Sequence, residues 1–288
     1  MNNKRVSKLK ELIFEKSFWQ NAWAFPSIMF AVVSVILSFY DFDFKNTLFW
    51  IILGVSIIYI ISFLIRASGL KSVTLNIDGS IFEISVGDIF EQDTEDYKVI
   101  AFNEYFDSKV DNDLISASTL NGMYIQKKYP KLKDVRKFDA RITNDPRLKK
   151  NIKETGVLRG LGGKTTKYEL GSIYRDEDYF LVALSKFDDD NEAGLNLTEY
   201  ATCLLKFWSE VNTLYNQKTV VMPLLGTGIT RKRDYDATDQ QLLEVLIWTF
   251  KISKVKFREP SKIKIVIHED KKRNINFYKL KELEKNGI

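Results

Sequence analysis

Cysteine and histidine are almost absent from this sequence. Its 288 residues include one cysteine, Cys203, and one histidine, His268. A single cysteine excludes a disulfide framework and a cysteine-based structural zinc site. A single histidine likewise excludes a histidine-rich metal site. We expect both residues to be structural, because Cys203 lies in an amphipathic helical pattern and His268 lies opposite the isoleucines of a strand pattern.

Charge is absent from two long stretches near the N-terminus. No Asp, Glu, Lys or Arg occurs in residues 17–40 or in residues 46–65. A helix needs about 20 apolar residues to cross a bilayer core of about 30 Å. The residues between the two stretches, DFDFK, predict a tight polar connection. We therefore predict a transmembrane hairpin over residues 17–65. Neither span contains an ionisable residue, which argues against a transporter or a proton path.

Two other interpretations of these stretches are weaker. A signal peptide fits poorly, since the first stretch is long, no small-residue cleavage site follows it, and a second stretch comes at once. Buried helices of a soluble core rarely lack charge over such lengths. Basic residues are concentrated in the N-terminal segment 1–16 and recur at Arg66 and Lys71, whereas the connection is mainly acidic. The positive-inside rule then predicts that both termini lie in the cytoplasm.

After a linker at residues 66–71, residues 72–288 alternate strand and helix patterns. A hairpin is predicted over residues 72–90, with its turn at Asp78 and Gly79. Near-continuous apolar runs at 98–102, 179–185 and 219–225 are typical of buried strands, and isoleucines on one face predict a final strand at 262–268. Helices are predicted over 198–214 and after a capping box that begins at Thr238. The polar, basic stretch 127–170 predicts a helix and a long inserted loop. The fold class is therefore α/β with a mixed sheet.

Three polar or glycine-rich segments follow predicted buried strands. The first contains Asp88 and Ile89, the second contains Asn103, Phe106 and Asp107, and the third contains Leu225, Gly226, Thr227, Gly228 and Ile229. Ligands of open α/β sheets bind at the carboxyl ends of strands, and glycines let backbone N–H groups surround an anion. Each segment taken alone is also compatible with an ordinary turn or loop cap.

Two further patterns could form sites. The segment Gly162-Gly163-Lys164 resembles a P-loop, but Leu158 stands where that motif needs a glycine and no buried strand precedes it. Arg231 begins a basic triplet close enough in sequence to the third segment to meet an anion, although such triplets are most often solvated surface. Residues 251–288 are also basic, but their interleaved acidic residues and the adjacent membrane favour a contact with the cytoplasmic leaflet, or no specific role, over nucleic-acid binding.

The order of the three segments resembles that of a macro domain. The resemblance covers residues 72–288 and rests on Gly87-Asp88-Ile89, on the polar loop at 103–107, and on the PLLGTGI turn at 223–229. The sequence departs from the family in the first loop, where the usual asparagine-rich and glycine-rich run is missing. With the hairpin in front, the chain resembles membrane-anchored macro effectors of bacterial Thoeris anti-phage systems.

That resemblance implies a function. It implies that a partner TIR-domain enzyme makes an ADP-ribose derivative, histidine-ADP-ribose in the transmembrane type, and that the macro domain senses this signal without a cofactor. Asp88 and Ile89 would hold adenine, the glycine turn the diphosphate, and the 103–107 loop the distal ribose. Oligomers in the bacterial inner membrane would then disrupt it in an abortive defence. The alternatives are a membrane-tethered ADP-ribosyl hydrolase or ADP-ribose reader, and an anchor or nucleic-acid binder acting through the basic C-terminus.

Overall fold

The computed structural model describes residues 13–14, 16–40, 43–160, 162–187, 193–227, 231–232 and 237–285. These residues form two compact units. One contains the first two long helices and the C-terminal helix, and the other runs over Thr74–Ile275.

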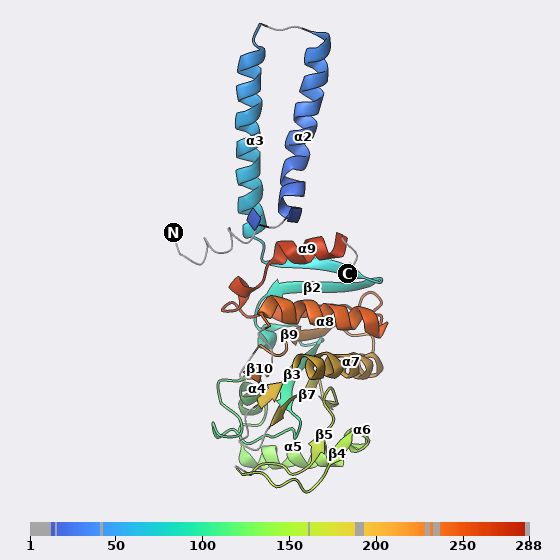
Figure 1. The fold of residues 1–288 in the computed structure, drawn as a ribbon. Helices are drawn as coiled ribbons and strands as arrows, with labels where there is room; N and C mark the ends of the chain where they lie inside the picture. Colours follow the sequence, from blue (N-terminus) through green and yellow to red (C-terminus); the bar gives the residue numbers. More distant parts are fainter. Residues whose placement is uncertain are drawn as a thin grey trace. The chain divides into compact units, whose positions relative to one another are not determined.

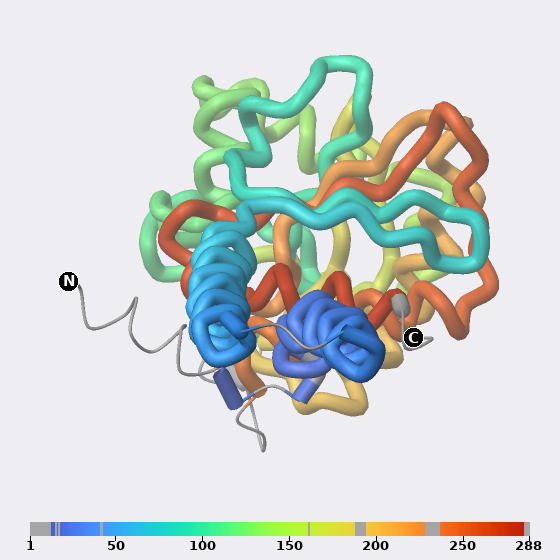
Figure 2. Tube along the Cα trace, turned by 90° about the horizontal axis from the view of Figure 1, so that it is seen from above, coloured from blue at the N-terminus to red at the C-terminus, as the bar shows by residue number. Residues whose placement is uncertain are grey.

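The first unit is built on a pair of long antiparallel helices, α2 (Lys16–Phe39) and α3 (Lys45–Ser68), which lie side by side in Figures 1 and 2. Within them, Phe18–Phe39 has a mean hydropathy of 2.0 and Lys45–Ser68 one of 2.7, so both are long and apolar enough to cross a membrane. Large apolar side chains such as Val32, Ile36 and Ile58 are exposed. Such outward-facing apolar surface suits lipid better than water.

A short C-terminal helix, α9 (Phe277–Lys285), belongs to the same unit. Its Tyr278 packs in a buried cluster with Phe18, Ala22 and Ala67 of the two long helices. The side-chain amide of Asn21 donates to the hydroxyl of Tyr278 at 2.9 Å and to Glu282 Oε2 at 3.0 Å. The sequence analysis assigned this segment to the macro-like domain without predicting a helix there.

The second unit is organised around a nine-stranded sheet of order β1-β2-β11-β9-β3-β7-β8-β10, in which β6 pairs with β7 off that path. The strands are β1 (Ser72–Ile77), β2 (Ser80–Val86), β3 (Tyr97–Asn103), β6 (Ile173–Asp176), β7 (Tyr179–Phe187), β8 (Ala193–Leu195), β9 (Val220–Pro223), β10 (Arg231–Lys232) and β11 (Ile263–Ile267). Strands β2, β11, β9, β3 and β7 run parallel, whereas β6 and β8 are antiparallel to β7. The predicted mixed sheet is thus confirmed.

Local sequence explains how the elements begin and turn. Asp78 and Gly79 both have positive φ, as a two-residue turn between β1 and β2 requires. Helix α7 (Leu197–Leu214) opens with a capping box of Asn196 and Glu199. Helix α8 (Asp239–Ser253) opens with the predicted box of Thr238 and Gln241. Each box satisfies N–H groups that the first helical turn leaves free.

Helices cover both faces of the sheet. Trp208 of α7 and Phe250 of α8 pack against Phe82 of β2. Another cluster joins Phe102 and Leu181 to Phe138, which lies in α5 (Leu132–Asn144). Because neighbouring strand residues point to opposite faces, these two clusters form the two sides of an α/β/α arrangement.

The stretch 127–170 differs from its prediction as a helix and a long loop. It contains the end of α4 (Leu120–Lys128), then α5, α6 (Pro146–Lys149), a 3-residue strand β4 (Ile152–Glu154) and β5 (Lys167–Tyr168), which pairs with β4. Helix α5 buries only Phe138 and Ile142. Two apolar residues among many basic ones give little helical periodicity, which explains why the sequence pattern was weak here.

Candidate functional site at the carboxyl edge of the sheet

The three predicted segments lie at the same edge of the sheet. Strands β2, β9 and β3 run in the same direction, and the segments follow their carboxyl ends. Asp88 follows β2, the 103–107 loop ends β3, and Leu225 and Gly226 follow β9. This is the edge where ligands of open α/β sheets bind.

Asp88 is partly engaged in local structure. Its Oδ1 accepts a hydrogen bond from the N–H of Phe90 at 2.8 Å and so caps the 3-residue helix η1 (Ile89–Glu91). The side chain of Ile89 is buried in the core cluster with Phe102 and Phe106. A ligand at this edge could therefore contact Asp88 through Oδ2 and Ile89 through its backbone.

Asn103 organises the loop after β3. Its Oδ1 accepts from the N–H groups of Tyr105 at 3.1 Å and Asp107 at 3.2 Å, and its amide donates to Asp107 Oδ2 at 2.9 Å. Phe106 has a φ of 51° and is fully buried in the core. The side chain of Asn103 thus fixes the conformation of the loop, and the buried ring of Phe106 attaches the loop to the core.

Asp107 is held by a segment that the sequence analysis had set aside. Arg159 Nη1 lies 2.7 Å from Asp107 Oδ2, and the N–H of Lys164 donates to Oδ1 at 2.9 Å. Lys164 Nζ donates to the carbonyl of Phe106 and pairs with Asp139 Oδ1, both at 2.6 Å. Burial lowers the pKa of Lys164, and Asp139 partly offsets that effect. The rejected Gly162-Gly163-Lys164 motif is therefore a brace for this loop.

The turn after β9 needs a glycine for two reasons. Gly226 has a φ of +80°, and a Cβ there would lie 3.1 Å from the ring of Tyr200. The hydroxyl of Tyr200 donates to the carbonyl of Leu225 at 3.0 Å, and Thr227 Oγ1 donates to the carbonyl of Leu224 at 3.0 Å. The predicted residues Gly228 and Ile229 lie outside the described residues, as does the side chain of Arg231.

Glu104 is a member of this edge that sequence reasoning missed. It is 1% exposed, and its Oε1 accepts from the N–H of Phe187 at 3.2 Å and lies 3.3 Å from Lys167 Nζ. Burial raises the pKa of Glu104, although Lys167 works against that effect. It lies in the predicted 103–107 loop but was not singled out, because its partners are contributed by β5 and β7, far along the chain.

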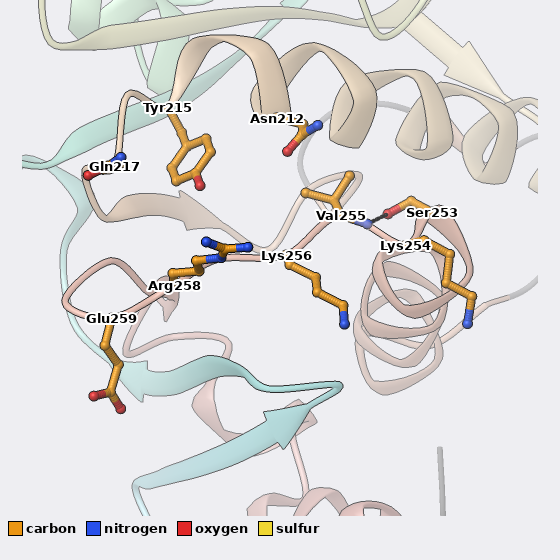
Figure 3. Close-up of a pocket in the computed structure, with 9 residues that line it drawn as sticks. All are labelled: Asn212, Tyr215, Gln217, Ser253, Lys254, Val255, Lys256, Arg258 and Glu259. Carbon is orange, nitrogen blue, oxygen red and sulfur yellow. Dashed lines mark hydrogen bonds between the residues drawn. The ribbon is translucent and has the colours of Figure 1, made fainter.

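A hollow lies at the opposite edge of the sheet, where β9 and β11 begin (Figure 3). It has a volume of about 610 Å³. Its lining comprises Asn212, Tyr215, Gln217, Ser253, Lys254, Val255, Lys256, Arg258 and Glu259. Its lysines and arginine are exposed and stand just beyond the carboxyl end of α8, where cations complement the helix dipole. We assign it no ligand. Among the described residues, no group of three or more metal-ligating side chains is present.

Comparison with known proteins identifies the family. A family model described as Thoeris protein ThsA, Macro domain, matches residues 82–268. The chain is 50% identical over 285 residues to the Thoeris protein ThsA of Bacillus amyloliquefaciens (strain Y2), a match that covers 98% of this chain and 94% of the relative.

Two solved structures of the Oceanobacillus iheyensis macrodomain are also similar to part of the chain. A mutant with ADPR is 15% identical, with a TM-score of 0.48, and covers 74% of this chain and 99% of that one. The macrodomain with ADP is 14% identical, with a TM-score of 0.48, and covers 75% of this chain and 97% of that one. The family assignment depends on the sequence matches alone. Because the family model spans more than half of the chain and the relative matches nearly all of it, the chain belongs to the Thoeris protein ThsA family and carries its Macro domain.

Proposed function

We propose that this protein is a membrane-anchored Thoeris effector whose macro domain binds an ADP-ribose-type signal and then disrupts the membrane. The observation that carries the proposal is the turn at Gly226, at the carboxyl edge of the sheet in a chain that also has two membrane-length helices. The signal we propose is histidine-ADP-ribose made by a TIR-domain partner, as the family resemblance implies.

The edge offers the groups that such a ligand needs. A turn built on Gly226 presents backbone N–H groups without a Cβ in the way, which suits a diphosphate. Each charge-assisted hydrogen bond contributes about 1.5–3 kcal/mol. Asp88 Oδ2 would accept from an adenine amine, and the loop at 103–107 would meet the distal ribose.

Signal binding must favour an active state by enough to switch it. Moving an equilibrium from 1:99 to 99:1 takes about 5.5 kcal/mol of differential affinity, which a few such bonds supply if they form only in the active state. A two-helix hairpin cannot enclose a pore alone. We therefore propose that activation assembles several copies, whose exposed apolar helices pack together in lipid.

Hydrolysis of ADP-ribose is the less favoured function. A hydrolase would need a residue free to activate water near the distal ribose. Both oxygens of Asp107 are engaged, by Asn103 and Arg159 on one side and by the N–H of Lys164 on the other. Asn103 is committed to folding the loop. These contacts leave Asn103 and Asp107 poorly suited to activate water and so support a sensor. Glu104, whose Oε2 has no hydrogen-bond partner among the described residues, is the carboxylate that a hydrolase would use.

Calorimetry on the full chain in detergent micelles tests this proposal. We expect binding of histidine-ADP-ribose and weaker binding of ADP-ribose, with the ligand recovered unchanged by mass spectrometry. Absence of binding to either compound would overturn the sensor assignment. Release of free ADP-ribose during incubation would instead establish the hydrolase.

A further inference from the structure

Glu104 is a buried carboxylate with one unsatisfied oxygen. Among the described residues, its Oε2 has no hydrogen-bond partner although the side chain is 1% exposed. Buried polar atoms are nearly always paired, and an unpaired carboxylate oxygen is costly. Such an atom at a ligand-binding edge calls for an explanation.

Two other buried carboxylates show what full pairing looks like in this domain. Both oxygens of Asp107 have donors, as described above. Asp176 pairs its Oδ1 with Arg141 and its Oδ2 with Lys128 and with the hydroxyls of Tyr124 and Tyr129. Asp107 and Asp176 thus have partners at both oxygens, whereas Glu104 has partners at only one among the described residues.

The missing partner of Glu104 must be a donor. Its Oε1 already accepts from Lys167 and from the N–H of Phe187, and both contacts favour the ionised form. An ionised carboxylate has no proton to give and can only accept hydrogen bonds. Burial also raises the pKa of Glu104, so a further donor at Oε2 would stabilise the charge.

Glu104 is held rigidly at the ligand edge. Its N–H donates to the carbonyl of Ser185 at 2.9 Å, and its carbonyl accepts from the N–H of Tyr168 at 2.8 Å. It directly follows Asn103, in the loop to which the macro-domain resemblance assigns the distal ribose. The guanidinium of Arg159 covers the neighbouring Tyr105 ring at 4.0 Å.

We propose that Glu104 forms a subsite for a hydrogen-bond donor carried beyond the distal ribose, namely a protonated amine or a ring N–H, and so selects substituted ADP-ribose over ADP-ribose itself. This subsite rests on the proposed function, since it needs an ADP-ribose-type ligand at the same edge.

The test compares three ligands on the full chain in detergent micelles by calorimetry. They are ADP-ribose, its methyl glycoside and histidine-ADP-ribose. The methyl group attached to the distal ribose carries no hydrogen-bond donor, whereas the histidine attached there does. The variant is Glu104→Gln, which keeps the shape but loses the charge. Glu83→Gln is the matched control, because Glu83 pairs with Lys262 away from this edge. Thermal unfolding of each variant checks that it is folded.

The wild-type protein should prefer histidine-ADP-ribose to the methyl glycoside. Glu104→Gln should reduce that preference by about 10- to 100-fold, the equivalent of one charged hydrogen bond, while Glu83→Gln should not change it. A folded Glu104→Gln protein with the wild-type preference would overturn the subsite, as would equal binding of all three ligands by the wild type. If the wild type binds none of them, the proposed function fails and the subsite fails with it.

Discussion

Gly226 combines a positive φ with a close approach to Tyr200, and both features can be tested by one substitution. Gly226→Ala should lower the free energy of unfolding by about 1–3 kcal/mol through backbone strain and should strongly weaken nucleotide binding. Gly79→Ala is the matched control, because Gly79 also has a positive φ but has open space around it and lies in the β1–β2 turn. The Gly79→Ala protein should lose stability, measured by urea unfolding, and should keep its affinity for the nucleotide, measured by calorimetry. Full affinity in Gly226→Ala would remove this turn from the site.

The buried ion pair of Arg159 and Asp107 stabilises the 103–107 loop. The two side chains are 5% and 1% exposed. Arg159→Ala should cost about 3–5 kcal/mol, because it leaves a buried carboxylate without its charged partner. Arg147→Ala breaks the more exposed pair with Glu210 and should cost about 0–1 kcal/mol. Equal losses in urea unfolding would show that the 103–107 loop does not depend on this brace.

Glu104 predicts a pH dependence of stability with a definite sign. Burial raises its native-state pKa above the ordinary value of 4.5. Below that value the group is protonated in both states, so its contribution to stability is fully present. As pH rises through the raised pKa, the unfolded state ionises first and the contribution is lost. Glu104→Gln should therefore gain stability relative to the wild type as pH rises from about 4 to about 8, by urea unfolding. A constant difference would contradict the assigned shift.

At the scale of elements, the C-terminal helix is tied to the long hairpin by a few polar contacts. Asn21→Ala removes the donor to Tyr278 and Glu282 and leaves a mostly buried carboxylate less well paired. Hydrogen exchange in α9 should then rise about 5- to 10-fold, which corresponds to about 1 kcal/mol of lost stabilisation. Lys281→Ala is the control, because Lys281 is exposed on the same helix. Unchanged exchange in Asn21→Ala would show that apolar packing alone holds α9.

Elements with strong local signals could be predicted from the sequence, and those fixed by distant partners could not. The helices over the two long uncharged runs, the Asp78-Gly79 turn and the capping box at Thr238 are all confirmed, because each depends on neighbouring residues. A helix was predicted within 127–170, but the bounds of α5 and the β4–β5 pair were not predicted, since the few apolar residues of this stretch form no clear pattern without the sheet they pack against. The predicted loops do lie at one edge, but Arg159 and Lys164 contact Asp107 from more than fifty positions away.

For the whole molecule, the charge asymmetry predicts that both termini are cytoplasmic. A cysteine at Asn46 should react with an impermeant reagent in intact cells, whereas one at Ser7 should not. The native Cys203 is buried and serves as an internal background. Its pKa is raised by burial to about 12, which further suppresses its reactivity. The reverse labelling pattern would overturn the topology.

The central claim is that nucleotide sensing triggers membrane damage, and release of a dye from vesicles tests it most directly. The full chain would be reconstituted into sealed lipid vesicles with the macro domain outside, and histidine-ADP-ribose would be added. We predict dye release that depends on the ligand and on protein density, and none with Gly226→Ala. Release without ligand, or intact vesicles at saturating ligand with binding confirmed in the same sample, would contradict the account.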